Sequence, residues 1–301
     1  MSPKNATIPW ADIQSHAQQS TEKMLTFSRI EPVSGGDMHA AFCIKVDCDK
    51  ALFVKINDKK TYPVFISEAE SLCAIKNTQS IVTPQVICHG KAGLHSYLIM
   101  EHLCLSSSGN EYVLGQQLAK VHQTSPYKLE GAFGFDNDNH IGLTPQKNLW
   151  TASWHDFWVE QRLKPQLQLA YQNGFRETLK PYEVKLILAS NELLSHHSPV
   201  AALVHGDLWS GNKAYQNQAP VIFDPACYYA DREVDIAMTE LFGGFSAEFY
   251  QGYNDVWPLE RAYEQRKTLY NLYHMLNHLN LFGSGYLRNV KHMIADIINF
   301  D

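Results

Sequence analysis

Two short apolar segments in the C-terminal half of the chain each run into an aspartate, and this arrangement constrains the fold more than any other feature. The segment AALV at 201–204 leads into HGDLWSGN at 205–212, and VIF at 221–223 leads into Asp224. We predict two adjacent short strands that place Asp207, Asn212 and Asp224 together at their ends. Mg²⁺ bound to phosphates prefers such a sparse set of carboxylate and amide ligands. The pattern indicates phosphoryl transfer, although each piece taken singly is an ordinary turn former.

The N-terminal half contains two charged residues that complement each other. Lys55 lies in an apolar strand predicted at 51–56, and Glu68 lies in the helix that follows, on the same face as Phe65 and Leu72. A lone strand lysine is ordinarily an edge or surface residue. An unpaired carboxylate on an apolar helix face is costly to bury, however. We therefore predict that Lys55 and Glu68 form the ion pair that kinases use to hold the α- and β-phosphates.

The chain divides into a strand-rich part and a mainly helical part. The segment LSSSGN at 105–110 is the clearest linker, because it contains turn formers and nothing apolar after its first residue. We predict an N-terminal nucleotide-clamping lobe at 1–104, a hinge at 105–110 and a C-terminal catalytic and substrate lobe at 111–301. The N-terminal lobe is expected to contain a single helix, around 65–75, and strands at 27–33, 40–46, 51–56, 81–88 and 94–100. The C-terminal lobe is expected to contain helices at 113–124, 154–172, 181–196 and from 231 onward.

Composition excludes several classes of protein. There are 25 Lys and Arg against 31 Asp and Glu, a formal charge of −6, whereas nucleic-acid and anionic-membrane binders need a basic face. No apolar stretch approaches the roughly 18–20 residues that span a bilayer, and the N-terminus lacks the apolar core of a secretory signal. The six cysteines form no CxxC pair and are expected to be free thiols. We expect a cytoplasmic protein without nucleic-acid or membrane partners, and a monomer.

Seven motifs together resemble the fructosamine kinase (ketosamine-3-kinase) family over nearly the whole chain. They are SGGDMHAAF at 34–42, FVKIN at 53–57, EAESL at 68–72, LGQQLAKVHQ at 114–123, FGFDNDNHIGLTPQKN at 133–148, HGDLWSGN at 205–212 and FDPACYYADREVDIAM at 223–238. The last two contain HGDLWSGN and FDPACYYADRE, which are specific to this family. The related aminoglycoside and choline kinases share only the plain HGD…N and the later Asp.

The resemblance implies both a fold and an activity. The fold is α+β, protein-kinase-like and bilobed, with a small antiparallel sheet and one main helix in the N-lobe and a larger, mainly helical C-lobe. The activity is ATP- and Mg²⁺-dependent phosphorylation of the 3-hydroxyl of a ketosamine, a sugar attached to a small amine or a protein. The 3-phosphate is unstable and releases the free amine, so the expected outcome is deglycation.

The same resemblance implies roles for the two groups of residues described above. Asp207 would position and deprotonate the sugar hydroxyl. Asn212 and Asp224 would bind Mg²⁺, and Lys55 with Glu68 would orient ATP.

Further residues would surround the nucleotide. Gly35 and Gly36 would form the turn that covers the phosphates, although any hairpin can use two glycines. The backbone of Glu101, His102 and Leu103 would meet the adenine. Some members of the family have a redox-sensitive cysteine in the glycine-rich turn. This chain has Asp37 there, so thiol regulation through that turn is not expected.

Three residues would support the site or contact the substrate. Asp235 resembles the helix aspartate that braces the catalytic loop in this superfamily, and His205 would be a second brace unless it is simply a packed histidine. Trp209 would pack on the C–H face of the sugar, and a core-facing indole is the alternative.

Two alternative functions stay open at this point. The acceptor could be an aminoglycoside, a choline-like alcohol or a free sugar, and the protein could be a pseudokinase that only binds. The complete set of lysine, aspartate, asparagine and metal-binding aspartate positions argues against the pseudokinase. The sequence leaves open whether a ribose-, erythrose- or glucose-derived ketosamine is preferred, and which amine it carries.

Two apparent metal motifs are rejected. His274 and His278 have the i, i+4 spacing of a zinc pair, but HExxH is absent and no third ligand is evident, so a packed or solvated helix pair is preferred. The run DNDNH at 136–140 begins like a calcium loop, but Ile141 and Lys147 replace the required Gly and Glu. By resemblance, the segment 133–148 is instead expected near the substrate cleft.

Overall fold

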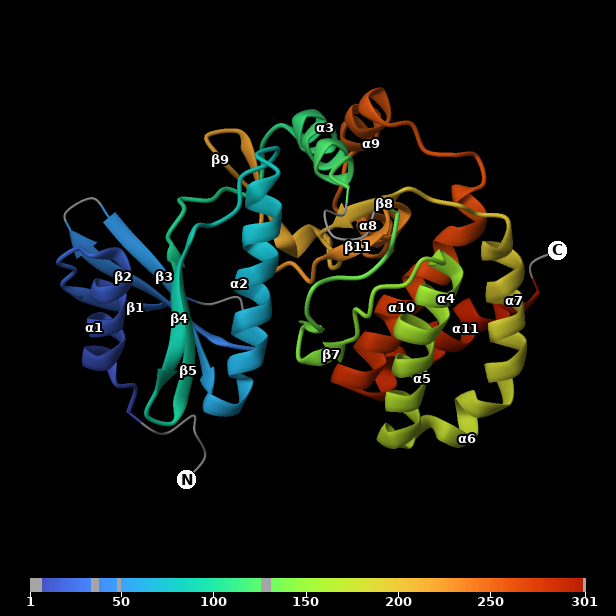
Figure 1. Cartoon of the computed structure of the whole chain (residues 1–301), viewed down its shortest axis with the longest axis horizontal. Helices are drawn as coiled ribbons and strands as arrows, with labels where there is room; N and C mark the ends of the chain where they lie inside the picture. Colours follow the sequence, from blue (N-terminus) through green and yellow to red (C-terminus); the bar gives the residue numbers. More distant parts are fainter. Residues whose placement is uncertain (1–6, 34–37, 48–49, 126–130, 300–301) are drawn as a thin grey trace.

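The computed structural model describes residues 7–33, 38–47, 50–125 and 131–299. Its N-terminal part is an antiparallel sheet with two helices, and its C-terminal part is mainly helical (Figure 1). The predicted α+β architecture, with a small antiparallel sheet in the N-lobe and a mainly helical C-lobe, is confirmed. Among the described residues, no helix is both long enough and apolar enough to cross a bilayer.

The N-lobe sheet has the strand order β1-β2-β3-β5-β4, and every neighbouring pair is antiparallel. Side chains alternate between its two faces. On β3, Val54 and Ile56 face α1, whereas Lys55 faces α2 and Glu68. Figure 1 shows α1 and α2 on opposite sides of the sheet. The elements are α1 (Trp10–Thr21), β1 (Arg29–Val33), β2 (Ala40–Asp47), β3 (Lys50–Asp58), a 3₁₀ turn (Lys59–Thr61), α2 (Tyr62–Asn77), β4 (Val86–Ala92) and β5 (His95–Glu101).

Two predictions for the N-lobe are wrong. A single helix was expected, but α1 is a second one, and it escapes pattern analysis because it buries only Ile13 and Ala17. A strand was expected at 81–88, but β4 begins at Val86 and continues to Ala92. The polar residues at 89–91 belong to an edge strand of the antiparallel sheet, where one face can be solvated.

The segment 105–110, predicted as the hinge, lies between β5 and α3 and contains no helix or strand. Ser106 forms an isolated antiparallel bridge with Tyr215 of the C-lobe, through backbone hydrogen bonds of 2.8 and 2.9 Å. The segment ends at Asn110, which caps α3 (Glu111–His122) by accepting a 3.0 Å hydrogen bond from the Val113 amide. The last residue of the segment that connects the two lobes therefore caps the first helix of the C-lobe.

Replacing Asn110 with alanine should lower the free energy of unfolding by about 1 kcal/mol, because an amide at the start of α3 loses its side-chain acceptor. Urea denaturation measures the change. Ser107→Ala, at an exposed position of the same segment, is the control and should change stability by less than about 0.5 kcal/mol. Equal stabilities for the two variants would show that the cap contributes nothing.

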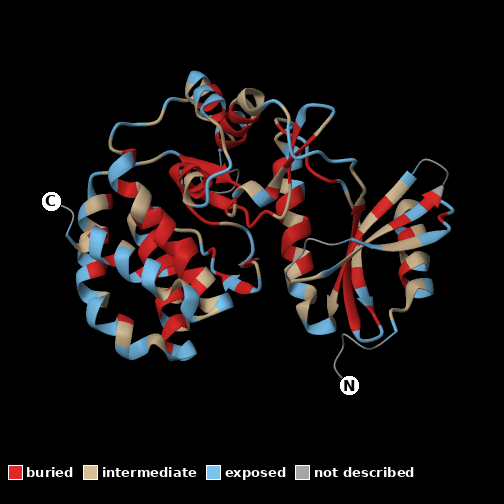
Figure 2. Ribbon diagram, turned by 180° about the vertical axis from the view of Figure 1, so that it is seen from behind, coloured by how far each residue is buried: buried red, intermediate tan, exposed pale blue. Residues whose placement is uncertain are grey.

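The C-lobe surrounds an extended core of buried residues contributed by most of its helices (Figure 2). Helix α10 carries many of them, including Leu269, Leu272 and Leu276. The predicted helix at 154–172 is interrupted by π-helical turns, and the predicted helix at 181–196 begins later. The helices are α4 (Trp154–Trp158), α5 (Lys164–Ala170), α6 (Arg176–Leu179), α7 (Glu183–Ser195), α8 (Glu233–Leu241), α9 (Ala247–Val256), α10 (Tyr263–Phe282) and α11 (Leu287–Ile298), with π turns at Val159–Leu163 and Tyr171–Phe175 and 3₁₀ turns at Lys180–Tyr182, Ser210–Asn212 and Ser284–Tyr286.

The described part of the C-lobe contains three two-stranded sheets, and two of them flank the segments that carry Asp207, Asn212 and Asp224. The predicted strands at 201–204 and 221–223 do not pair with each other. Each pairs instead with a strand that the sequence pattern did not indicate, in the two-stranded antiparallel sheet β8/β11 and the hairpin β9/β10. The strands are β6 (Asn139–Ile141), β7 (Thr144–Gln146), β8 (Ala201–Val204), β9 (Lys213–Gln216), β10 (Ala219–Ile222) and β11 (Tyr228–Asp231).

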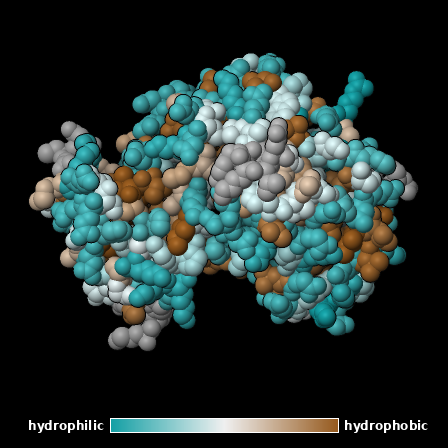
Figure 3. Space-filling view, in the orientation of Figure 1, coloured by the Kyte–Doolittle hydropathy of each residue, from teal (hydrophilic) through white to brown (hydrophobic). Residues whose placement is uncertain are grey.

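The β6/β7 hairpin joins the two lobes. Asn139 donates a 2.7 Å hydrogen bond to the Cys227 carbonyl, and the Cys227 amide donates to Ser71 Oγ on α2 at 3.2 Å. His140 contacts Ser67 Oγ of α2 at 3.1 Å. The surface over this side of the molecule is mostly hydrophilic, with an indentation between the lobes at its lower edge (Figure 3).

Candidate active site

Lys55 is the central cation of the candidate site. Its Nζ lies 2.7 Å from Glu68 Oε1 and 2.5 Å from Asp224 Oδ1, and only 9% of its side chain is exposed. Burial alone would lower the pKa of Lys55, but the carboxylates of Asp224 and Glu68 raise it above its ordinary value. The predicted Lys55–Glu68 pair is therefore formed, and it reaches across the lobes to Asp224.

The β9/β10 hairpin brings Asn212 and Asp224 together. Lys213 pairs with Ile222, so the residue before β9 lies beside the residues after β10, and the Phe223 amide donates to the Asn212 carbonyl at 3.1 Å. Asp224 has a left-handed backbone, with φ 58°, a conformation that non-glycine residues adopt at a cost and that clusters at functional sites. Lys55 holds the pKa of Asp224 below its usual range, against the effect of burial.

The donor chemistry at this hairpin fits a magnesium ion. Asn212 Nδ2 donates to the Asp207 carbonyl at 2.9 Å, which fixes the amide and leaves its oxygen as an acceptor. Asp224 binds Lys55 through Oδ1, and its side chain is 43% exposed. An amide oxygen and a carboxylate are hard ligands of the kind Mg²⁺ takes together with phosphate oxygens and water.

Asp235, at the start of α8, holds the loop that carries Asp207. Its Oδ2 accepts from the His205 amide at 2.6 Å and from His122 Nε2 at 3.0 Å, and its Oδ1 accepts from the Gly206 amide at 2.8 Å. Although burial would raise it, the hydrogen bonds from His122 and the His205 amide lower the pKa of Asp235. His122 was not predicted as a site residue, although it lies within the LGQQLAKVHQ motif.

His205 and Gly206 shape the same loop. The Asp207 amide donates to His205 Nδ1 at 3.3 Å, so Nδ1 is the acceptor and Nε2 carries the proton toward the Phe223 carbonyl at 3.0 Å. Burial lowers the pKa of His205, which favours this neutral form. Gly206 has φ 82°, and a Cβ there would lie 2.2 Å from the Ala226 carbonyl oxygen. No other residue fits without moving the backbone.

Asp207 is largely buried, with 23% of its side chain exposed. Burial and the neighbouring carboxylates of Asp224 and Asp235 raise its pKa to about 7. A carboxylate with a pKa near neutrality is well matched to accept a proton from a hydroxyl.

Of the backbone amides predicted to meet the adenine, those of Glu101 and His102 already form hydrogen bonds with neighbouring strands or loops of the N-lobe. The Glu101 amide donates to the Gln85 carbonyl at 2.9 Å, and the His102 amide donates to the Ala51 carbonyl at 3.2 Å. Within the described residues, the Leu103 amide has no such partner. Gly35 and Gly36, the predicted phosphate-covering turn, lie outside the described residues.

Trp209 is 40% exposed, so its indole does not face the core. A Cβ on Gly211 would lie 2.2 Å from the Trp209 ring, so the indole covers this glycine in the same loop. A large apolar surface is thus presented two residues after Asp207.

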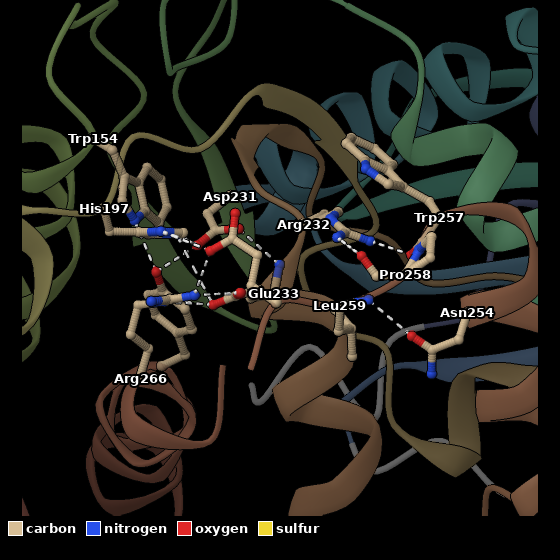
Figure 4. A network of polar contacts seen from close by, with 12 residues as sticks. Trp154, His197, Asp231, Arg232, Glu233, Asn254, Trp257, Pro258, Leu259 and Arg266 are labelled. Carbon is tan, nitrogen blue, oxygen red and sulfur yellow. Dashed lines mark hydrogen bonds and ion pairs between the residues drawn. The ribbon is translucent and has the colours of Figure 1, made fainter. Parts of the chain in front are cut away.

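A buried charge network anchors the start of α8 (Figure 4). Arg266 of α10 forms two hydrogen bonds with Glu233, at 2.7 and 2.6 Å. Asp231 accepts from His197 at 2.6 Å and from the Tyr270 hydroxyl at 2.6 Å. His197, Asp231 and Glu233 lie close enough together to be considered as metal ligands. Arg266 already binds both oxygens of Glu233, and Asp231 already accepts from His197 and Tyr270, so the network is better explained as the support of α8 and its Asp235.

The His274/His278 zinc motif is not realised. His278 Nδ1 contacts the His274 carbonyl at 2.8 Å, and its ring packs against Phe242, Phe282 and Tyr286. His274 points elsewhere, toward Asp207.

Comparison with known proteins agrees with this geometry. The family model for fructosamine kinase matches residues 9–300. A probable ketoamine kinase from Synechocystis is 45% identical over 299 residues, 98% of this chain and 99% of the relative. Another from Vibrio parahaemolyticus is 44% identical over 293 residues, 95% of this chain and 99% of the relative.

Solved structures show the same relationship. A provisionally named fructosamine-3-kinase from Haemophilus somnus superposes with a TM-score of 0.87 at 31% identity, covering 96% of this chain and 97% of the other. An aminoglycoside phosphotransferase shares the fold at 15% identity, with a TM-score of 0.63 and coverage of 95% and 98%. The chain therefore belongs to the fructosamine kinase family and is a phosphotransferase whose acceptor is a hydroxyl group.

Proposed function

We propose that the protein uses ATP and Mg²⁺ to phosphorylate the 3-hydroxyl of ketosamines. The labile 3-phosphate then releases the free amine, so the amine is deglycated. The observation that carries the proposal is Lys55 bound to both Glu68 and Asp224, with the partly exposed carboxylate of Asp207 near that of Asp224. The names of relatives at 44–45% identity, probable ketoamine kinases, support the acceptor class.

In this proposal each charged group has one task. Asp207 accepts the proton of the sugar hydroxyl, whose oxygen forms a bond to the γ-phosphorus while the bond to the ADP oxygen breaks. Lys55 holds the α- and β-phosphates, and Glu68 keeps Lys55 in place. Asp235 and His205 hold the loop, so that Asp207 needs little rearrangement in the transition state.

Asn212 and Asp224 would hold the metal, which would neutralise charge on the phosphates as they rearrange. Distant members of the fold support a nucleotide and a cation. An aminoglycoside phosphotransferase was solved with ADP and hygromycin B, and an amicoumacin kinase with AMP-PNP and Ca²⁺. We place the adenine against the Leu103 amide, since the amides of Glu101 and His102 are used by the sheet. Gly35 and Gly36 remain our proposal for the turn over the phosphates, and Trp209 for a contact to the sugar.

The same proposal extends to the lobes, the cellular compartment and the partners of the enzyme. Nucleotide binding would lie between lobes 1–104 and 111–301, joined by the hinge at 105–110. The described cysteines are all free thiols, which suits the reducing cytoplasm. The substrate would be a small glycated amine or a glycated protein side chain, and the enzyme would act as a monomer without nucleic-acid or membrane partners.

An acceptor panel tests the function. Fructosamine, ribulosamine and erythrulosamine forms of one amine should be phosphorylated with a kcat/KM at least about 100-fold above an aminoglycoside, choline or free fructose. ADP release measures turnover, and Asp207→Asn enzyme gives the background rate.

Other outcomes of the panel decide between the alternatives. Preferential phosphorylation of the aminoglycoside, choline or free sugar would replace the acceptor class and leave the kinase chemistry standing. A folded protein that binds ATP but phosphorylates no member of the panel would establish the pseudokinase.

A further inference from the structure

His274 of α10 is a buried polar side chain without a partner. It is 1% exposed, and within the described residues neither ring nitrogen has a hydrogen-bond partner. Burial lowers the pKa of His274 to about 3, so the ring is neutral and carries one proton. Buried polar groups are nearly always hydrogen-bonded, and exceptions tend to have a functional reason.

The nearest acidic group to this ring is the predicted catalytic carboxylate. His274 Nδ1 lies 3.9 Å from Asp207 Oδ1, beyond hydrogen-bonding distance. In the described part of the chain, the hydrogen bonds of Asp207 are made by its backbone amide and carbonyl. Neither oxygen of its side-chain carboxylate has a hydrogen-bond partner there. An unpartnered donor and an unpartnered acceptor therefore face each other across a gap about 1 Å too wide.

We propose that His274 is a positioning residue, which donates a hydrogen bond from Nδ1 to Asp207 Oδ1 and thereby turns the other oxygen, Oδ2, toward the acceptor hydroxyl. This inference rests on the proposed role of Asp207 as proton acceptor. The proton of the neutral ring belongs on Nδ1, because that nitrogen faces the negative carboxylate. A small rotation of the Asp207 side chain closes the gap, and such catalytic hydrogen bonds commonly tighten only when substrate is bound.

The two residues reach each other only through the fold. Asp207 is held by its backbone through Asp235 and Asn212, which leaves rotation of its side chain uncontrolled. His274 is held rigidly within α10 by its burial and by its packing on Tyr273. A fixed hydrogen-bond donor beside a carboxylate that can rotate favours one orientation of that carboxylate. The Asp207 side chain then spends more of its time in the orientation that can accept the hydroxyl proton.

The test separates positioning from packing. His274→Leu fills the same space and removes two buried polar atoms, so the thermal midpoint should stay level or rise. Its kcat should fall about 10- to 50-fold with the KM for ATP and for the acceptor within about twofold, because a group that acts on the transition state changes kcat rather than ground-state binding. His274→Asn, whose amide donor can occupy the place of Nδ1, should recover at least about one third of the lost activity on a logarithmic scale. His278→Leu, one turn further along α10, is the matched control and should turn over like the wild type.

A double variant shows whether His274 acts through Asp207. Adding His274→Leu to Asp207→Asn should lower kcat by less than about twofold, since the carboxylate that His274 orients is already gone. A further 10-fold loss in the double variant would mean an independent role and overturn the proposal. So would a His274→Leu enzyme with wild-type kcat, or equal losses for His274→Leu and His274→Asn.

The comparison is made on whichever acceptor the wild type phosphorylates best. If that acceptor is not a ketosamine, the proposed function is wrong, but the ratio of the variant kcat to the wild-type kcat still tests the role of His274. If no acceptor is phosphorylated, both proposals are contradicted.

Discussion

Replacing Asp207 with asparagine is expected to lower kcat by about 10³-fold, within the range that a positioned proton acceptor contributes. Asparagine has the same shape but cannot take the proton. The loop should keep its conformation, because Asp235 and Asn212 hold it through backbone atoms that the substitution does not change. Loss of activity without loss of structure is therefore the expected result.

The thermal midpoint provides a second, opposite expectation. Burial, together with the neighbouring carboxylates of Asp224 and Asp235, raises the pKa of Asp207 to about 7. A neutral amide removes that repulsion, so the variant should be as stable as the wild type or slightly more stable. ATP affinity, measured by calorimetry, should change by less than about threefold, since Lys55 still holds the phosphates.

The control for this experiment is Asp296→Asn, at an exposed position of α11. It should retain wild-type turnover and stability. If Asp207→Asn kept more than a tenth of the wild-type kcat, Asp207 would not be the proton acceptor. Loss of ATP binding together with turnover would point instead to collapse of the cleft.

Replacing Lys55 with methionine should have the second largest effect. Truncating one partner of a buried, hydrogen-bonded charge group costs roughly 2–5 kcal/mol, a factor of about 30 to 5,000 in kcat/KM for ATP. The loss has two sources. The phosphates lose their cation, and Glu68 and Asp224 lose the charge that lies between their carboxylates at 2.7 and 2.5 Å. We expect the KM for ATP to rise and kcat to fall.

The variant should also be less stable without nucleotide. Burial disfavours the ionised form of Glu68, and methionine removes the ammonium that opposes this effect. Thermal unfolding with and without Mg²⁺·ATP measures both consequences, because ligand binding should stabilise the wild type far more than the variant.

Lys45→Met provides the matched control, since Lys45 is exposed on the neighbouring strand β2. Its kcat/KM for ATP and its stability should stay within about twofold and 0.5 kcal/mol of the wild type. If Lys55→Met behaved like Lys45→Met, the ion pairs across the cleft would have no role in nucleotide binding.

The sequence predicted the Lys55–Glu68 ion pair better than it predicted the strands and helices around it. The apolar spacing around Phe65 and Leu72 placed Glu68 on the inner face of α2, and strand alternation placed Lys55 on the face toward it. Local periodicity reports which face of an element is buried. It worked for Glu68 because α2 buries a continuous stripe that includes Phe65, Leu72 and Ile75.

The elements that were missed lack that signal. Helix α1 buries only two residues. Strands β9 and β11 are four residues each, and β11 is buried throughout, so it has no alternating pattern. The strands at 201–204 and 221–223 were expected to be neighbours, but each pairs with one of these missed strands. Pairing depends on backbone partners that the side-chain pattern does not name.

From the sequence alone, the chemistry of this protein could be inferred, because an Asp, an Asn and a second Asp after short strands, with a lysine and a glutamate upstream, suit few reactions other than phosphoryl transfer. The tertiary structure decided how those groups control one another. Lys55 meets Asp224 across 169 residues, and His122 meets Asp235 across 113. His274 comes to face Asp207 only because the fold brings α10 close to the loop that carries Asp207. Such pairings arise from the packing of distant elements, in which burial makes each charge or orphaned donor depend on a partner that no local pattern records.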